Sequence, residues 1–166
     1  MSNLLDLCTS NATSHLGPCA EVRVGEHVTR YVRRGSGPSV VVIGADAEAN
    51  PLWTPLVEQL TAAHRVVVPQ APPSGTDVSG WLRGFIEGIG LSSIVLIAGS
   101  TASSAALDLA ITDDFTVRRL VLLPSGENNG GGTADRPMGQ AADRTLWVLP
   151  NWSLAESLSH IARFVA

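Results

Sequence analysis

The sequence predicts an α/β fold in which an N-terminal antiparallel hairpin leads into a mostly parallel sheet flanked by helices. Two observations predict it. Five short apolar segments start about 26 residues apart, and helical patterns lie between the first three of these segments. Segments that are rich in β-branched residues and do not alternate with polar ones are typical of strands buried on both faces. Strand–helix alternation at this spacing favours right-handed crossovers and a parallel sheet.

The strands come in two kinds. Residues 20–34 alternate apolar and polar side chains around a tight turn at Gly25, which predicts a hairpin, and a Gly-Ser-Gly-Pro loop follows at 35–38. The five apolar segments then predict the parallel strands: 40–43, 66–68, 94–98, 120–123 and 146–149. About seven strands and four or five helices are therefore expected.

Three helices are predicted by apolar residues that recur on one face. Residues 51–64 and 77–91 each carry such a stripe, and residues 153–166 add a capping box of Ser153 and Glu156. The stripes are Trp53, Leu56, Val57 and Leu60; Trp81, Leu82, Phe85, Ile86 and Ile89; and Leu154, Leu158, Ile161 and Val165.

Gly80, Gly84 and Gly88 are spaced by four on the second of these helices. Each glycine costs about 1 kcal/mol relative to alanine inside a helix. The stripe predicts either close packing against another helix, with a dimer partner as one candidate, or simply a weak helix beneath a strong core face.

Composition limits the classes of function. The chain has 166 residues, 45% of them apolar and 16% charged, which predicts one domain with a substantial core. No apolar run approaches the roughly 20 residues that cross a bilayer, and the N-terminus does not resemble a secretory signal. The net charge is −4 and the arginines are scattered, which excludes a basic nucleic-acid-binding face. We therefore expect a cytoplasmic protein that binds neither membrane nor nucleic acid, with Cys8 and Cys19 reduced rather than joined in a disulfide.

Cofactor and metal sites are not indicated. The turn after the first parallel strand, residues 44–50, lacks the glycine pattern of a dinucleotide site, and no phosphate-binding loop occurs. The four histidines are far apart, at positions 15, 27, 64 and 160, without ligand spacing. No cofactor and no metal are expected.

From Glu21 onward the chain resembles the α/β-hydrolase superfamily. The resemblance rests on the hairpin and Gly-Ser-Gly-Pro loop before VVVIGA, on RVVVPQAPPSGTD (65–77), on IVLIAGSTASSAALDLA from Ile94 and on VRRLVLLPSG (117–126). It implies a truncated α/β-hydrolase-like domain over 20–166 after a leader at 1–19, with a Gly-rich loop at 127–144 in place of a cap. It also implies an oxyanion turn at Gly44-Ala45 and a nucleophile elbow at Ser100.

The triad that such an elbow serves is incomplete. Ser100 has alanines two residues before and after it, which a tight elbow tolerates, but it could equally be a turn or helix-cap residue. The family's histidine loop corresponds here to 150–153, where Asn151 cannot accept a proton. His160 should face solvent, while His27 and His64 should be structural. Glu127 matches a variant position of the acid, although a solvated loop carboxylate is the alternative.

In doubly wound sheets, ligands bind outside the carboxyl ends of the strands. The predicted catalytic residues there are Ser100, Asp46 and Glu127, and the predicted oxyanion amides are Ala45, Asp46 and Thr101. The predicted pocket residues are Gly44, Gln70, Asp77, Gly99, Asn151 and Trp152.

Three functions remain open. The first is a non-hydrolytic enzyme, of cyclase, epimerase, isomerase or lyase type, acting on a small apolar carbonyl compound. The resemblance supplies precedent for it in bacterial natural-product metabolism. The second is a residual Ser100 esterase or thioesterase, and the third is a non-catalytic binding or partner subunit, with a homo-oligomer as one form.

Overall fold

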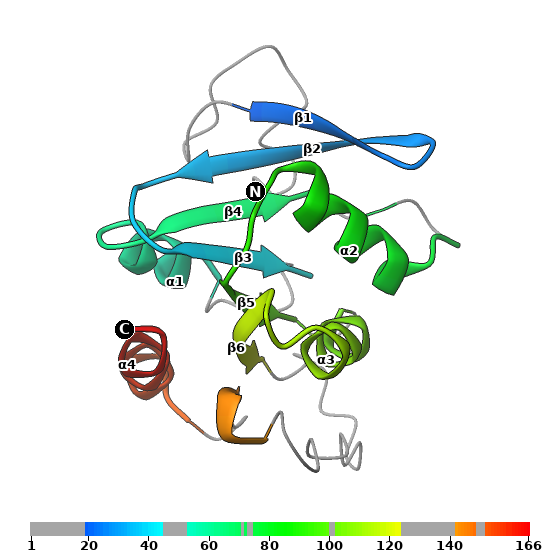
Figure 1. Ribbon diagram of the computed structural model, residues 1–166. Helices are drawn as coiled ribbons and strands as arrows, with labels where there is room; N and C mark the ends of the chain where they lie inside the picture. The colour runs from blue at the N-terminus through cyan, green and yellow to red at the C-terminus, as the bar shows by residue number, and fades with distance from the viewer. Residues whose placement is uncertain are drawn as a thin grey trace.

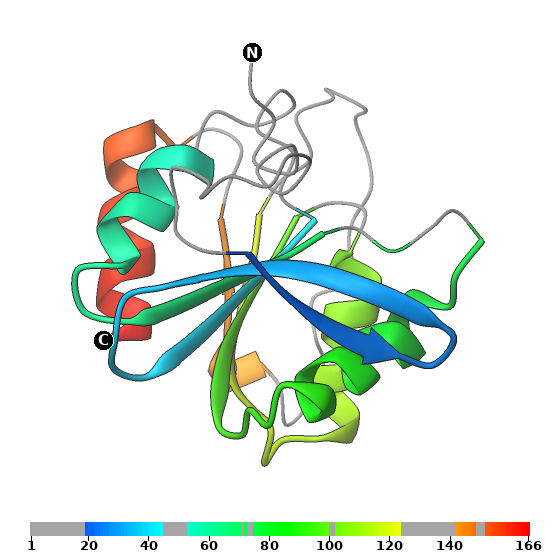
Figure 2. The same cartoon turned by 90° about the horizontal axis from the view of Figure 1, so that it is seen from above.

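A seven-stranded sheet lies between two layers of helices (Figures 1 and 2). The computed structural model describes residues 19–44, 53–70, 72, 75–99, 102–123, 142–148 and 152–166. The strand order is β1-β2-β4-β3-β5-β6-β7. The antiparallel hairpin followed by parallel strands confirms the predicted fold class.

The hairpin consists of β1 (Cys19–Val24) and β2 (His27–Arg34), joined at Gly25 as expected. Strand β2 also pairs antiparallel with β4, and all further pairs are parallel. Each parallel strand falls on a predicted apolar segment: β3 (Ser39–Ile43), β4 (Arg65–Pro69), β5 (Ile94–Ala98), β6 (Val117–Leu122) and β7 (Thr145–Trp147). A short 3-10 turn (Ala142–Arg144) precedes β7.

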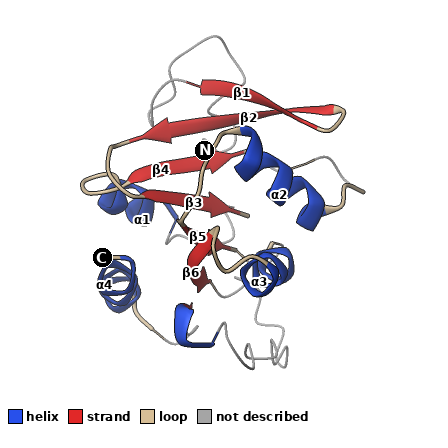
Figure 3. Cartoon of the chain, in the orientation of Figure 1, coloured by secondary structure: helices blue, strands red, loops and turns tan. Residues whose placement is uncertain are grey.

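Of the helices that the structure describes, two pack on each face of the sheet, as Figure 3 shows. On one face α1 (Trp53–Leu60) and α4 (Leu154–Val165) pack in one apolar core, and on the other α2 (Val78–Gly88) and α3 (Ser103–Thr112) pack in a second. The stripe predicted for α1 is buried in full, and that of α2 is buried from Trp81 to Ile86, with Ile89 partly buried.

The buried face of α4 differs from the prediction at its first turn. Leu154 is 47% exposed, whereas Ser157, Ile161 and Val165 form the buried line. By helix periodicity Leu154 lies on the same face as Ile161 and Val165, but as the first residue of α4 it stands at the end of the helix and does not reach the core. The capping box is confirmed: the Glu156 N–H donates to Ser153 Oγ (3.2 Å), and the Ser153 N–H donates to Glu156 Oε2 (2.7 Å).

The glycine stripe of α2 packs closely, but against a strand of the same chain. A Cβ at Gly84 would lie 2.9 Å from Val24 Cγ1, and one at Gly88 would lie 2.9 Å from Val22 Cγ2. Both valines belong to β1. The expectation of a helical partner for the stripe is therefore wrong at these two positions, because β1 already occupies the space that the missing side chains leave.

Side-chain hydrogen bonds connect helices to the sheet. The buried Trp81 Nε1–H of α2 donates to Thr29 Oγ1 of β2 (3.0 Å), and Thr29 is itself buried. The Arg144 guanidinium donates to the carbonyl oxygens of Val117 (2.7 Å) and Ala110 (3.2 Å). It thereby ties the segment before β7 to the carboxyl-terminal half of α3 and the start of β6.

Cys19 is disulfide-bonded, which corrects the expectation that both cysteines are reduced. The sequence holds one other cysteine, Cys8, which lies outside the described residues. Disulfides persist in oxidising compartments, so Cys19 does not support the predicted cytoplasmic location. Among the described helices, none is long and apolar enough to cross a membrane.

Candidate functional site

The carboxyl ends of β3 and β5 meet at one edge of the sheet, where the sequence predicts the site. The two strands pair in parallel up to Ile43 and Ala98. Gly44 and Gly99 follow directly, and the Gly99 N–H donates to the Ile43 carbonyl oxygen (2.9 Å). The loops that carry the predicted oxyanion amides and the predicted nucleophile therefore leave the sheet side by side.

This junction has no room for a side chain at position 99. A Cβ on Gly99 would collide with the Gly44 carbonyl oxygen and would lie 2.9 Å from Cζ2 of the buried Trp53. Gly44 has φ +67°, and a Cβ there would lie 3.2 Å from Ala102 Cβ. The sequence contains glycine at both positions because a turn of this kind requires close backbone approach.

Four residues, 99–102, separate β5 from α3. The Gly99 carbonyl oxygen accepts from the Ala102 N–H (3.0 Å) and from Ser103 Oγ–H (2.8 Å). Ala102, at the N-cap of α3, makes no side-chain capping bond. The Ala102 side chain therefore offers no acceptor to the first backbone N–H groups of α3. Such N–H groups at the start of a helix favour a nearby anion.

Several predicted site residues lie outside the described residues. They are Ala45, Asp46, Ser100, Thr101, Glu127 and Asn151. The elbow at Ser100 therefore stays a prediction. So do the predicted bases and oxyanion amides.

The other predicted pocket residues, Gln70, Asp77 and Trp152, are described. Gln70 is exposed, and its N–H donates to the Arg30 carbonyl oxygen (2.7 Å). Asp77 is exposed at the N-cap of α2, where its carbonyl oxygen accepts from the Trp81 N–H (2.9 Å). Trp152 precedes α4 and packs partly on the core. Of the described members of the predicted site, Gly44 and Gly99 are the pair that the structure brings into contact.

The described histidines have positions that suit structural roles. His64 precedes β4 at the amino end of the parallel strands, opposite the Gly44–Gly99 junction. His27 is exposed in the hairpin. His160 is exposed, as expected, and stacks on Trp152 with ring centroids 4.3 Å apart and an interplanar angle of 23°. His15 lies outside the described residues.

Two carboxyl groups have lowered pKa values, and both serve helix ends. The backbone N–H of Ser153, in the capping box, holds the pKa of Glu156 below its usual value. Hydrogen bonds from the Thr116 side chain and backbone do the same for the pKa of Asp113, just after α3. Neither group lies at the Gly44–Gly99 junction, so these shifts are explained by secondary structure rather than by catalysis.

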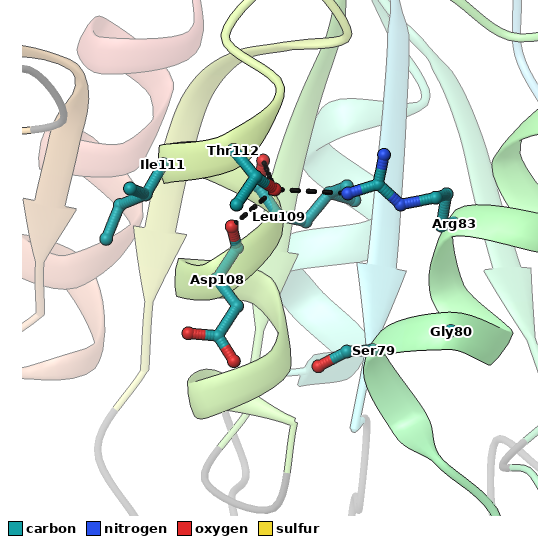
Figure 4. A pocket seen from close by; sticks show the side chains of 7 residues that line it. All are labelled: Ser79, Gly80, Arg83, Asp108, Leu109, Ile111 and Thr112. Carbon is teal, nitrogen blue, oxygen red and sulfur yellow. Dashed lines mark hydrogen bonds between the residues drawn. The ribbon is translucent and has the colours of Figure 1, made fainter.

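A separate open groove lies between α2 and α3 (Figure 4). Its volume is about 360 Å³, and the Arg83 guanidinium donates across it to Thr112 Oγ1 (3.1 Å). It is lined by Ser79, Gly80, Arg83, Asp108, Leu109, Ile111 and Thr112. The sequence does not predict this groove, because its residues are spread over two helices and form no motif. None of the predicted site residues lines it.

No protein-family model and no curated protein sequence matches this chain. Solved structures do match in fold. A protein assigned as a lipase from Acinetobacter baumannii AYE aligns with TM-score 0.55 and 23% identity, over 64% of this chain and 40% of that protein. A membrane phospholipase A described as a bacterial virulence factor aligns with TM-score 0.55 and 22% identity, over 64% and 39%.

The epoxide hydrolase VrEH1 from Vigna radiata also aligns, with TM-score 0.54 and 17% identity, over 64% of this chain and 39% of that protein. The chain thus spans about 40% of the length of these hydrolases. Identities this low establish shared architecture only. With its strand order and the paired glycines after β3 and β5, the chain has the α/β-hydrolase fold.

Proposed function

We propose that this protein is a cofactor-free enzyme that acts on a small apolar carbonyl compound without a serine–histidine hydrolytic step. The reaction would take place at the carboxyl edge of the sheet, next to the Gly44–Gly99 junction. The close approach of these two glycines supports this position, because it starts the loops 45–50 and 100–101 from adjacent points. The substrate carbonyl would lie between the two loops.

The proposed chemistry is proton transfer next to the carbonyl. Backbone amides of Ala45, Asp46 and Thr101 would donate hydrogen bonds to the oxygen as negative charge develops on it, a contribution worth several kcal/mol. The carboxylate of Asp46 or Glu127 would remove the α-proton and return it at the same or another carbon. Return of the proton to a carbon gives an isomerase or an epimerase. In a cyclase the enolate would instead attack an electrophilic carbon of the same substrate, and in a lyase it would expel a leaving group from the β-carbon; Ser100 has no covalent role in any of these.

The observation that carries the proposal is the placement of the described histidines. A serine nucleophile needs a base within hydrogen-bond reach. His64 lies at the opposite end of the sheet, and His160 stacks on Trp152. The loop before α4 has Asn151 where the resemblance places the histidine, and an amide cannot serve as a base.

Deuterium uptake tests the proposal. The protein is incubated in D₂O with an apolar cyclic ketone, and incorporation at the α-carbon is followed by NMR. We expect uptake above the buffer rate, a loss of about 10²–10⁴-fold in Asp46→Asn or Glu127→Gln, and no loss in Ser100→Ala. Uptake that survives both carboxylate substitutions would show that neither residue is the base.

A residual Ser100 esterase is the second candidate. The four-residue turn from β5 into α3 supports it, as does the fact that the structural neighbours are named as lipase, phospholipase and epoxide hydrolase. A fluorophosphonate probe distinguishes it: labelling of the wild type and not of Ser100→Ala would favour the esterase over the first proposal. A chain that shows neither labelling nor uptake would fit a non-catalytic subunit.

A further inference from the structure

Strand β1 forms one edge of the sheet. No strand in the part of the chain that the structure describes pairs with its outer side. It has six residues, whereas the strand at the opposite edge, β7, has three. Short edge strands resist pairing with another chain, and longer ones offer a row of backbone donors and acceptors. Of the two edges, β1 is therefore the one able to pair.

The hairpin determines which residues of β1 present those groups. The pair Val24 and His27 closes its two-residue turn and is therefore a hydrogen-bonded pair. The backbone N–H and C=O groups of Val24, Val22 and Ala20 accordingly point toward β2. The alternate residues Cys19, Glu21 and Arg23 direct theirs outward.

An independent contact supports this assignment. Arg30 is the cross-strand partner of Glu21, and its carbonyl oxygen accepts from the Gln70 N–H (2.7 Å), just after β4. The backbone of Arg30 therefore points away from β1. The pair Glu21–Arg30 is then not hydrogen-bonded between β1 and β2, and the Glu21 amide and carbonyl face the free edge.

We propose that β1 pairs antiparallel with β1 of a second copy of this chain, in a register centred on Val22. An outward residue must face an outward residue, which leaves three registers that pair most of the strand. In a register centred on Glu21 or on Arg23, the central residue lies opposite the same residue of the second copy, so like charges meet. In the register centred on Val22, Glu21 of each copy lies opposite Arg23 of the partner subunit, so opposite charges meet at both positions.

Both faces of the paired strands are compatible with this register. Glu21 and Arg23 are exposed on the face where Arg30 Nε–H donates to Glu21 Oε1 (3.0 Å). Pairing extends this contact into a row of alternating charge across the interface. On the other face Val22 meets Val22 of the partner subunit. The two seven-stranded sheets then become continuous.

Sedimentation equilibrium tests the proposal with charge reversals. We expect a wild-type dimer that weakens with added salt, because the paired charges are exposed. Glu21→Arg and Arg23→Glu should each weaken self-association at least tenfold, since each now sets like charges opposite. An equimolar mixture of the two single variants should regain dimer, and so should the double variant Glu21→Arg/Arg23→Glu.

The double variant also distinguishes weaker self-association from a less stable monomer. Glu21→Arg loses the intramolecular contact with Arg30, and the double variant loses it too. Regained association in the double variant thus reports the interface rather than the stability of the hairpin. Thermal unfolding of every variant verifies that the monomers are folded.

Amide hydrogen exchange supplies a second readout. The Glu21 and Arg23 amides should exchange quickly in dilute protein and slowly when concentrated. A wild type that stays monomeric at about 1 mM, far above the concentrations of most specific complexes, overturns the proposal. So does a dimer that survives both single reversals, a mixture of the reversals that does not associate, or protection of these two amides in dilute protein, which would mean that the chain itself covers the edge.

Discussion

Replacing Gly99 with alanine tests the junction at which the candidate site is built. A Cβ at this position would collide with the Gly44 carbonyl oxygen, a backbone atom, and would lie 2.9 Å from Trp53 Cζ2. Neither neighbour can rotate away, because Trp53 is 2% exposed and the Gly44 carbonyl is a backbone group directly after β3. The ends of β3 and β5 must therefore separate.

The expected cost has two parts. Overpacking a rigid site typically costs about 1–3 kcal/mol. Separation also weakens the bond from the Gly99 N–H to the Ile43 carbonyl oxygen, which contributes about 1 kcal/mol. We expect Gly99→Ala to lower the free energy of unfolding by about 2–4 kcal/mol, or roughly 2–4 °C in Tm for each kcal/mol. Urea unfolding followed by circular dichroism measures it.

Gly84→Ala is the matched control. Its Cβ would lie 2.9 Å from Val24 Cγ1, a side-chain atom rather than a backbone atom, and alanine gains about 1 kcal/mol of helix propensity. We expect its net effect to be within about 1 kcal/mol of zero. If Gly99→Ala costs no more than Gly84→Ala, the close approach of the two strand ends does not constrain this turn, and the argument for the site position fails.

Three further substitutions test other contacts. Thr29→Val should cost about 1–3 kcal/mol in urea unfolding, because it leaves the Trp81 indole N–H buried without an acceptor, whereas Thr29→Ser, which keeps the hydroxyl, should cost less. Arg144→Lys should cost about 1.5–3 kcal/mol, since an ammonium cannot reproduce a guanidinium fork that donates to several carbonyl oxygens; an effect near zero would mean that this tether is dispensable. The lowered pKa of Glu156 means that its stabilising contribution is present above its unfolded pKa and lost as pH falls through the folded value. The stability difference between wild type and Glu156→Gln should therefore shrink from about pH 5 to about pH 3, and a difference constant over that range would contradict the role of the carboxylate.

Local patterns predicted most of the fold. The apolar segments at 40–43, 66–68 and 94–98 became strands because their side chains suit burial on both faces, and α4 began at Leu154, directly after the predicted cap Ser153. The pattern was wrong where position in the fold decides burial. Leu154 fits the apolar face by periodicity, but the first turn of α4 leaves it exposed.

The candidate site was harder to predict than the fold. Gly44 and Gly99 were placed correctly at the strand ends, since a parallel sheet gathers such residues at one edge. Gln70 follows β4, the strand next to β3, and both Gln70 and Asp77 are exposed, so their part in the pocket stays a prediction. A rule about strand ends gives the edge of the sheet but not which side chains line a pocket there.

The sequence by itself determined the order of strands and helices, the hairpin with its turn at Gly25, and the capping box of α4, because each depends on neighbouring residues. Tertiary structure alone decided what fills the glycine stripe of α2, which carbonyl oxygens Arg144 reaches, and how closely Gly99 approaches Gly44. These contacts join residues far apart in the chain. They are fixed by how the strands register and how the helices pack, and no local pattern encodes that geometry.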